Sequence, residues 1–281
     1  MNKKSISIIL LVVAVIAWNL TVAYVDKKLQ ENKDDSVYAN CHKVWVARGL
    51  YKMHSEQNSI VSMQRAFAEG ALGVEIDLYY DVKMQRFIIS HDKPVKDSEG
   101  NLHYSEKNGK LLTLEHVLQT VGKGHYFWLD YKNLDKLSVK ESEHAIERLL
   151  SITYGSTVSE RLYIEGSNPF RLSMYTDAGF KTILGIHPLR ESSLFSSIVI
   201  NGYKLGYYFS NITGVALAYG AIDDPIYDEE TEKSLGAIPT FLFHVPDDKE
   251  MLHTLVSKSA VRVLLVGRDI SINRFDINNC E

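Results

Sequence analysis

Residues 73–78 read Gly73-Val74-Glu75-Ile76-Asp77-Leu78, an apolar run in which two acids stand two positions apart. Side chains alternate between the two faces of a β-strand, so Glu75 and Asp77 point to the same side, about 7 Å apart along the strand, while the aliphatic residues point to the other. Two carboxylates on one side of such a strand predict an oxygen-ligand site. The same alternation occurs on any solvent-facing strand, so the pair alone does not establish a metal.

The segments on either side of this stretch continue as alternating strands and helices. Strand candidates are residues 44–47, 74–79, 87–90, 125–130, 162–164, 182–186, 215–217, 240–245 and 261–266. Helices are expected after capping residues at Asn58 or Ser59, Thr113, Ser138, Asn168 and Asp247. This alternation predicts a TIM-type (β/α)8 barrel. Nine strand candidates exceed the eight that a closed barrel needs, so one is a hairpin arm or not a strand.

The N-terminus carries an export or anchoring segment. Residues 6–25 are almost entirely apolar and follow Lys3 and Lys4. A stretch of about 20 residues is long enough to span a bilayer, whereas a cleaved signal has an apolar region of about 7–15 residues. Both interpretations stay open, and the length favours an uncleaved anchor. We expect residues 1–25 to be this segment, 26–42 a tether, and 43–281 the barrel domain, outside the cytoplasm in a periplasmic or extracellular position.

Composition and cysteine content narrow the class of protein. The chain has 281 residues, of which 45% are apolar and 23% charged, which is typical of a globular protein. Lys and Arg number 31 against 35 Asp and Glu, so there is no basic excess and we expect no nucleic-acid partner.

Cys41 and Cys280 bracket the predicted barrel. In an oxidising compartment we expect them to form a disulfide, with two free thiols as the alternative.

Polar residues at the ends of the predicted strands form the candidate site, because catalytic groups of such barrels lie at the C-terminal ends of strands. Arg48 follows strand 44–47, His91 follows strand 87–90, and Asp130 and Lys132 end strand 125–130. With Glu75 and Asp77, Asp130 completes three hard oxygen donors. No Cys or His cluster accompanies them, so they suit Mg²⁺ or Ca²⁺.

Several short segments, in order and spacing, resemble the glycerophosphodiester phosphodiesterase family of PLC-like phosphodiesterase barrels. They are Ala47-Arg48-Gly49, Glu56-Gln57-Asn58-Ser59, the run from Gly70 to Asp77, Ser90-His91-Asp92 and Leu129-Asp130-Tyr131-Lys132. The family's corresponding pattern is His-Arg-Gly, Glu-Asn-Thr, Gly-Ala-x-Gly-x-Glu-x-Asp, His-Asp and Glu-x-Lys. The resemblance extends over about residues 43–269.

The resemblance implies a metal-dependent phosphoric diester hydrolase acting on glycerophosphodiesters or a related lipid or envelope phosphodiester. Its ligand would be a phosphodiester small molecule or a lipid head group, and residues 6–25 would contact the membrane. By position, the metal ligands for Ca²⁺ or Mg²⁺ would be Glu75, Asp77 and Asp130, the phosphate contacts Arg48 and Lys132, and a proton carrier His91. Asp130 is shorter than the family's Glu, which a flexible Ca²⁺ shell tolerates better than an Mg²⁺ octahedron.

The chain departs from the family at Ala47, where the family's first histidine stands. A methyl group cannot carry a proton, and general acid–base catalysis contributes roughly 10²–10⁴-fold in rate. His54, in the loop after the first strand, is the predicted substitute, while His187 and His244 are more typical of structural histidines. If no group substitutes, the barrel is a phosphodiester-binding or protein-interaction module. An alanine introduced to silence a histidine would leave the same pattern.

Overall fold

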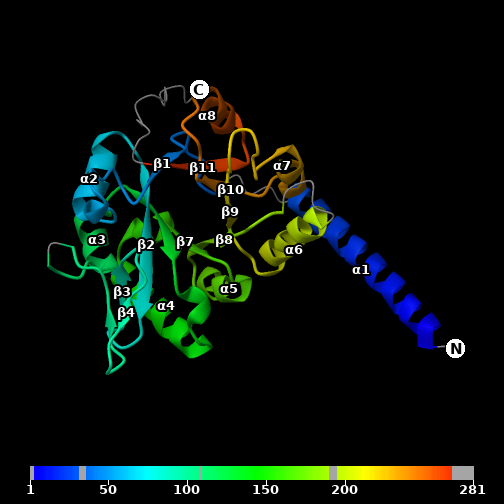
Figure 1. Cartoon of the computed structure of the whole chain (residues 1–281), viewed down its shortest axis with the longest axis horizontal. Coiled ribbons are helices and arrows are strands. Elements are labelled where there is room, and N and C mark those ends of the chain that lie inside the picture. Colours follow the sequence, from blue (N-terminus) through cyan, green and yellow to red (C-terminus); the bar gives the residue numbers. More distant parts are fainter. Residues whose placement is uncertain (1–2, 32–35, 108, 190–194, 268–281) are drawn as a thin grey trace.

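The strands close into a barrel, as predicted. The computed structural model describes residues 3–31, 36–107, 109–189 and 195–267 (Figure 1). Its eight barrel strands are β1 (Val44–Ala47), β2 (Gly73–Asp81), β6 (Tyr126–Tyr131), β7 (Leu162–Gly166), β8 (Lys181–Gly185), β9 (Gly214–Ala218), β10 (Thr240–Phe243) and β11 (Val261–Val266). They pair in parallel in the order β1-β2-β6-β7-β8-β9-β10-β11, and β11 pairs with β1 to close the barrel. The (β/α)8 prediction is therefore confirmed.

Helices follow most barrel strands and pack on the outside. They are α2 (Ile60–Ala68), α3 (Leu114–Val121), α4 (Val139–Thr153), α5 (Pro169–Asp177), α6 (Ser196–Phe209), α7 (Glu229–Leu235) and α8 (Lys249–Ser257), with short 3-10 turns η1 (His54–Glu56), η2 (Leu134–Lys136) and η3 (Thr157–Arg161). Ser59, Thr113, Ser138 and Asn168 cap their helices as expected. The last cap is Asp248, one residue after the predicted one.

The ninth strand candidate is a hairpin arm. β3 (Arg86–Ile89) pairs antiparallel with β2, from Leu78 opposite Ile89 to Asp81 opposite Arg86. A second small hairpin, β4 (Val95–Lys96) with β5 (Leu102–His103), follows it. The strand predicted over 240–245 ends at Phe243, because His244 adopts a left-handed backbone with φ of 50°.

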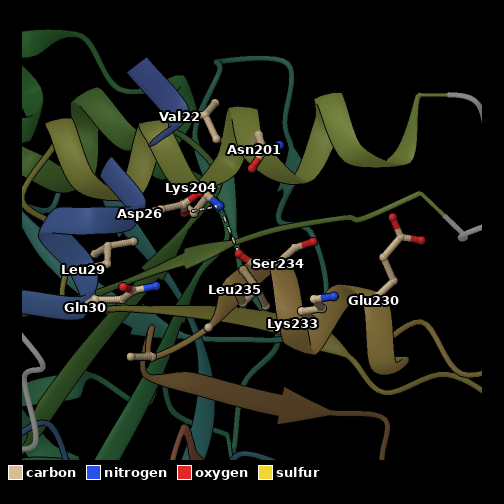
Figure 2. Close-up of a pocket in the computed structure, with 12 residues that line it drawn as sticks. Val22, Asp26, Leu29, Gln30, Asn201, Lys204, Glu230, Lys233, Ser234 and Leu235 are labelled. Atoms are coloured by element: carbon tan, nitrogen blue, oxygen red, sulfur yellow. Dashed lines mark hydrogen bonds and ion pairs between the residues drawn. The ribbon is translucent and has the colours of Figure 1, made fainter. Parts of the chain in front are cut away.

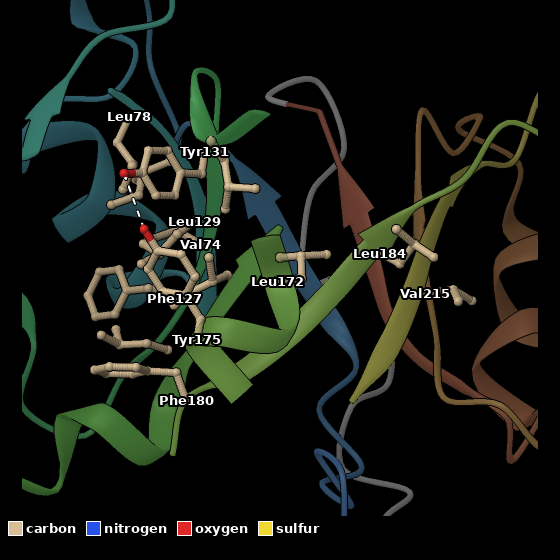
Figure 3. Packing of buried hydrophobic residues seen from close by; sticks show 14 of the residues in the cluster. Val74, Leu78, Phe127, Leu129, Tyr131, Leu172, Tyr175, Phe180, Leu184 and Val215 are labelled. Atoms are coloured by element: carbon tan, nitrogen blue, oxygen red, sulfur yellow. Dashed lines mark hydrogen bonds between the residues drawn. The ribbon is translucent and has the colours of Figure 1, made fainter. Parts of the chain in front are cut away.

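Two layers of apolar side chains hold the barrel. One lies between strands and helices, where Val74, Leu78, Phe127 and Leu129 pack against helix residues such as Tyr175 (Figure 3). On β2, Val74 and Leu78 alternate with Glu75 and Asp77, so the acids point into the barrel.

The second layer fills the barrel interior with aromatic rings. Trp45, Trp128, Tyr163 and Phe241 pack there, and Tyr38, from the segment before β1, lies edge-on to Trp45 with the ring centroids 4.8 Å apart. Gly73 lies so close to this layer that a Cβ would be 2.3 Å from the Trp45 ring, which excludes any larger residue. The N-terminal end of the barrel is therefore closed, and the polar end is left for a site.

The N-terminal helix α1 (Lys3–Glu31) is longer than the predicted apolar segment. Among the described residues it is the one helix long and apolar enough to cross a membrane, and its most apolar stretch of 18 residues is not buried. The predicted tether, residues 26–42, is not wholly extended. Helix α1 continues to Glu31. Further along, Val37 and Tyr38 are buried. Cys280 lies outside the described residues, so its disulfide with Cys41 stays a prediction.

Candidate active site

Three carboxylates meet inside the barrel at the C-terminal ends of β2 and β6. Glu75 and Asp77 are buried, and Asp130 is half-buried. One oxygen from each lies within 4.8 Å of the others, which is close enough for a shared cation. The strand register produces this arrangement, because Asp77 and Asp130 are direct neighbours across the β2–β6 pair.

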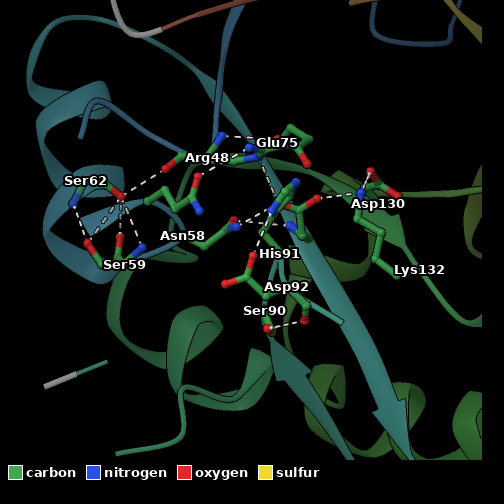
Figure 4. Close-up of polar contacts among 12 residues, drawn as sticks. Arg48, Asn58, Ser59, Ser62, Glu75, Ser90, His91, Asp92, Asp130 and Lys132 are labelled. Atoms are coloured by element: carbon green, nitrogen blue, oxygen red, sulfur yellow. Dashed lines mark hydrogen bonds and ion pairs between the residues drawn. The ribbon is translucent and has the colours of Figure 1, made fainter. Parts of the chain in front are cut away.

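Asp77 is the centre of a network of ion pairs, shown in Figure 4. Its Oδ2 lies 3.0 Å from Nε of Arg48, and its Oδ1 lies 2.6 Å from Nζ of Lys132. Lys132 also contacts Asp130. The backbone N–H of Arg48 donates to Oε2 of Glu75 at 3.1 Å. Both predicted phosphate contacts thus lie against the predicted metal ligands.

The loop between β1 and α2 positions this network through Asn58. The side chain of Asn58 is buried, donates to Asp77 Oδ2 at 2.7 Å and accepts from the Asp77 backbone N–H at 3.2 Å. Asn58 has a φ of 55°, a left-handed conformation that Asn tolerates better than most residues. Next to it, Gln57 Oε1 accepts from Arg48 Nη1 at 3.3 Å. The resemblance pointed to this segment but assigned it no role.

The acids of the site outnumber its cations. Four carboxyl groups, those of Glu75, Asp77, Asp130 and Glu165, line the same interior as the two cations Arg48 and Lys132. Burial raises the pKa of Glu75 well above its ordinary value, and the neighbouring Asp77 and Asp130 raise it further. Burial raises the pKa of Asp130 too, because Lys132 offsets that effect only in part. The residues present therefore fit a divalent cation, which would relieve this repulsion.

Glu165 is the site residue that sequence reasoning missed. It is the last residue but one of β7, next to Asp130 on β6, and its Oε2 accepts from Trp128 Nε1 at 2.6 Å. Burial, followed by the charge of Asp130, raises the pKa of Glu165 to about 8. Its position at the end of a predicted strand was the available signal. None of the segments that carry the family resemblance covers this position.

A cavity of about 460 Å³ opens above the carboxylates. Its lining comes from strand ends around the barrel and includes Ala47, Arg48, Glu75, Asp130, Lys132, Glu165 and His244. His244 therefore belongs to the cavity wall, although its sequence context is more typical of a structural histidine. Ala47 leaves a methyl group where the family's pattern has a histidine.

The two predicted proton carriers lie in different surroundings. His91 is half-exposed in the loop after β3, with its Nδ1 3.4 Å from Asp92 Oδ1. The preceding Ser90 donates its backbone N–H to the Asp77 carbonyl at 3.0 Å, which holds this loop beside the carboxylates. His54 is exposed on η1 with its ring 5.9 Å from that of Tyr51, and it is not among the residues that line the cavity. Neither His91 nor His54 is among the residues that line the cavity, but the bond from Ser90 places His91 one residue from a backbone contact with Asp77.

Several solved structures with a similar fold carry the name glycerophosphodiester phosphodiesterase. A protein of Galdieria sulphuraria assigned to the glycerophosphodiester phosphodiesterases matches with a TM-score of 0.60 at 12% identity, over 84% of this chain and 98% of that one. The barrel has the fold of the glycerophosphodiester phosphodiesterases. No family model and no curated protein sequence matches the chain.

Two further structures agree. A glycerophosphodiester phosphodiesterase from Parabacteroides distasonis matches with a TM-score of 0.53 at 16% identity, over 84% of this chain and 96% of that one. A phosphodiesterase from Oleispira antarctica, in complex with the product sn-glycerol-3-phosphate, matches with a TM-score of 0.57 at 12% identity over the same shares. At these identities the likeness establishes the fold, and the chemistry has to be argued from the site.

Proposed function

We propose that this protein is a metal-dependent phosphoric diester hydrolase of the glycerophosphodiester phosphodiesterase type. The observation that carries the proposal is the meeting of Glu75, Asp77 and Asp130 within 4.8 Å at the cavity floor, with Arg48 and Lys132 against them. Carboxylates that hold a cation, next to two fixed cationic side chains, match the charge pattern that a phosphodiester requires.

In this proposal the three carboxylates hold Ca²⁺ or Mg²⁺, which supplies charge to polarise the phosphoryl group. Arg48 and Lys132 contact the phosphate oxygens and neutralise charge that develops on them. Arg48 is oriented by Gln57 and by Asp77, so its guanidinium is already placed before substrate binds. The small ligand lies in the cavity of about 460 Å³, whose wall includes Phe243 and His244.

His91 is the proposed proton carrier for the leaving or attacking oxygen. Its imidazole is half-exposed, so it can exchange protons with water, and the preceding Ser90 is hydrogen-bonded to the Asp77 carbonyl. The second carrier of the family is absent at Ala47. His54 stays a prediction for that role, and its exposed position on η1 requires the loop to move if it is to serve.

The proposed substrate is a glycerophosphodiester or a related lipid or envelope phosphodiester. The Oleispira antarctica phosphodiesterase, a structure of the same fold, is bound to sn-glycerol-3-phosphate. Residues 6–25 are proposed to anchor the chain in a membrane, with the barrel on the periplasmic or extracellular side. Protection of the barrel from protease added to spheroplasts, from which any outer membrane has been removed, would contradict that orientation.

A second function is favoured by Ala47. Without the first histidine, the barrel can keep a cation and a phosphodiester yet lack turnover, which makes it a binding or protein-interaction module. Metal affinity does not separate the two functions, because both keep the carboxylates. Turnover does separate them.

The test is phosphodiester turnover by the full chain in detergent with Ca²⁺ or Mg²⁺. We compare the wild type with Glu75→Ala, with Ala47→His, and with Glu143→Ala as an exposed acid on α4. Activity in the wild type and Glu143→Ala, lost in Glu75→Ala, supports the hydrolase. Activity only in Ala47→His identifies a phosphodiesterase site that lacks one proton carrier. If no variant turns over and the wild type still binds the cation, the binding module is the better description.

A further inference from the structure

The last turns of α1 are joined to the barrel by an ion pair between a buried lysine on α6 and a partly exposed aspartate on α1. Nζ of Lys204, on α6, lies 2.5 Å from Oδ1 of Asp26, and the Lys204 side chain is only 4% exposed. The same ammonium donates to the carbonyl of Ser234 on α7 at 3.1 Å. Figure 2 shows Lys204 between these two partners, where α1, α6 and α7 meet. A buried ammonium that is held on both sides gives α1 one preferred position against the barrel.

Apolar contacts extend this junction along α1. Val25 is fully buried, and Leu29 packs against the core between strands and helices. The ring of Tyr24 lies edge-on to that of Tyr208 on α6, with centroids 6.2 Å apart. The contact therefore runs from Tyr24 to Leu29, and α1 does not swing on a flexible linker.

The rest of α1 determines the depth of this junction in a bilayer. Residues 6–25, at about 1.5 Å per residue, have the length of a hydrocarbon core of about 30 Å. With this stretch in the bilayer, Tyr24 and Asp26 lie at the boundary between hydrocarbon and head groups, where tyrosine is enriched. The junction holds α6 at the same depth.

The face of α6 beside the junction is apolar and exposed. Ile198 is 53% exposed and Phe209 is 63% exposed. They stand eleven residues apart, close to three full turns, so they share one face of the helix. That face is about 110° around the axis from the one that carries Lys204 and Tyr208 toward α1. Of the aromatic run Tyr207-Tyr208-Phe209, the first is buried, the second contacts α1 and the third is left in solvent.

We propose that this face of α6 rests in the interfacial layer of the membrane that α1 crosses, and that the Asp26–Lys204 pair holds the barrel in that orientation. The occupant of the face is the lipid surface, because the face is continuous with the junction that joins the barrel to its own apolar span. An amphipathic helix in this position inserts its apolar residues into the boundary between head groups and acyl chains. The inference rests on the proposed membrane anchor and not on the chemistry of the barrel.

The experiment places a tryptophan on α6 and measures its contact with lipid. The full chain is used, and its measured mass confirms that α1 is retained. It is reconstituted into nanodiscs, one chain per disc. The lipid is phosphatidylcholine with brominated acyl chains. The background is Trp18→Phe, because the two remaining tryptophans, Trp45 and Trp128, are buried inside the barrel. Phe209→Trp is compared with Val95→Trp, a residue that is 70% exposed on β4, on the side of the barrel away from α1 in Figure 1.

We expect brominated lipid to remove roughly half or more of the emission of the tryptophan at 209, since an interfacial helix inserts about 5–10 Å. The tryptophan at 95 should keep its emission. Equal quenching at both positions, or none at 209, overturns the proposal. A second result would also overturn it: the wild-type chain forms a dimer in detergent, Phe209→Asp dissociates that dimer, and the tryptophan at 209 is not quenched. In that case a second copy of the chain, and not lipid, covers α6. Loss of phosphodiester turnover has no bearing on these outcomes.

Discussion

Replacement of Asn58 by alanine tests whether the loop before α2 holds the carboxylate site together. The Asn58 side chain makes two hydrogen bonds to Asp77, one to the carboxylate and one from the backbone N–H. A hydrogen bond to a charged group contributes roughly 1.5–3 kcal/mol, and one between neutral groups about 0.5–1.5 kcal/mol. Asn58→Ala should therefore lower the free energy of unfolding by about 2–4.5 kcal/mol through these two bonds.

The backbone adds a separate contribution that a second variant measures. Alanine at a φ of 55° carries a left-handed strain that asparagine tolerates better, of about 1–2 kcal/mol. Asn211 has a φ of 52° and an exposed side chain, so Asn211→Ala reports the backbone effect alone. The difference between the two variants isolates the bonds to Asp77.

The assay is thermal unfolding of the full chain in detergent, followed by circular dichroism. At about 2–4 °C per kcal/mol for a domain of this size, Asn58→Ala should melt roughly 5–15 °C below Asn211→Ala. Equal melting temperatures for the two variants would refute the reasoning, because the bonds to Asp77 would then contribute nothing to stability.

Three further outcomes follow from the site. Ala47→His should raise phosphodiester turnover by roughly 10²–10⁴-fold if a missing proton carrier limits the rate; an unchanged rate would mean that another group already carries the proton. Ca²⁺ should raise the melting temperature of the wild type and leave Glu75→Ala unaffected, since a ligand that binds only the folded state stabilises it; an equal rise in both would place the cation elsewhere. Glu165 has a folded-state pKa of about 8, above its ordinary 4.5, so its neutral form is favoured by folding. The resulting destabilisation is absent below pH 4.5 and complete above pH 8, so with a chelator present Glu165→Gln should raise the melting temperature at pH 9 and not at pH 4; a rise of the same size at both pH values would contradict the assignment.

The amino-acid sequence by itself determined the features that depend on neighbouring residues. The alternation in Val74-Glu75-Ile76-Asp77 identified a strand and placed its acids on the inner face, because side-chain direction has a period of two. Ser59 and Asn168 identified helix starts, because a capping side chain accepts a hydrogen bond from a backbone N–H in the first turn of its own helix. The order of these elements was sufficient to predict the barrel.

Helix α6 marks the limit of such local reasoning. Its sequence includes Gly202 and Gly206 and apolar residues on several sides, so it shows no clear apolar stripe. In the folded chain it packs against α1 and α7. The antiparallel orientation of β3 is also decided by its pairing with β2. A short apolar run in the sequence is compatible with a parallel or an antiparallel strand.

Only the tertiary structure decided which residues meet. The register of β2, β6 and β7 brings Asp130 beside Asp77 and Glu165 beside Asp130, and a loop residue, Asn58, reaches the same carboxylate. The pairing of Asp26 with Lys204 joins positions 178 residues apart in the chain. Local periodicity carries no information about register or about contacts across such distances. These are set by the packing of the whole barrel, where burying the aromatic interior and satisfying each buried charge allow one arrangement.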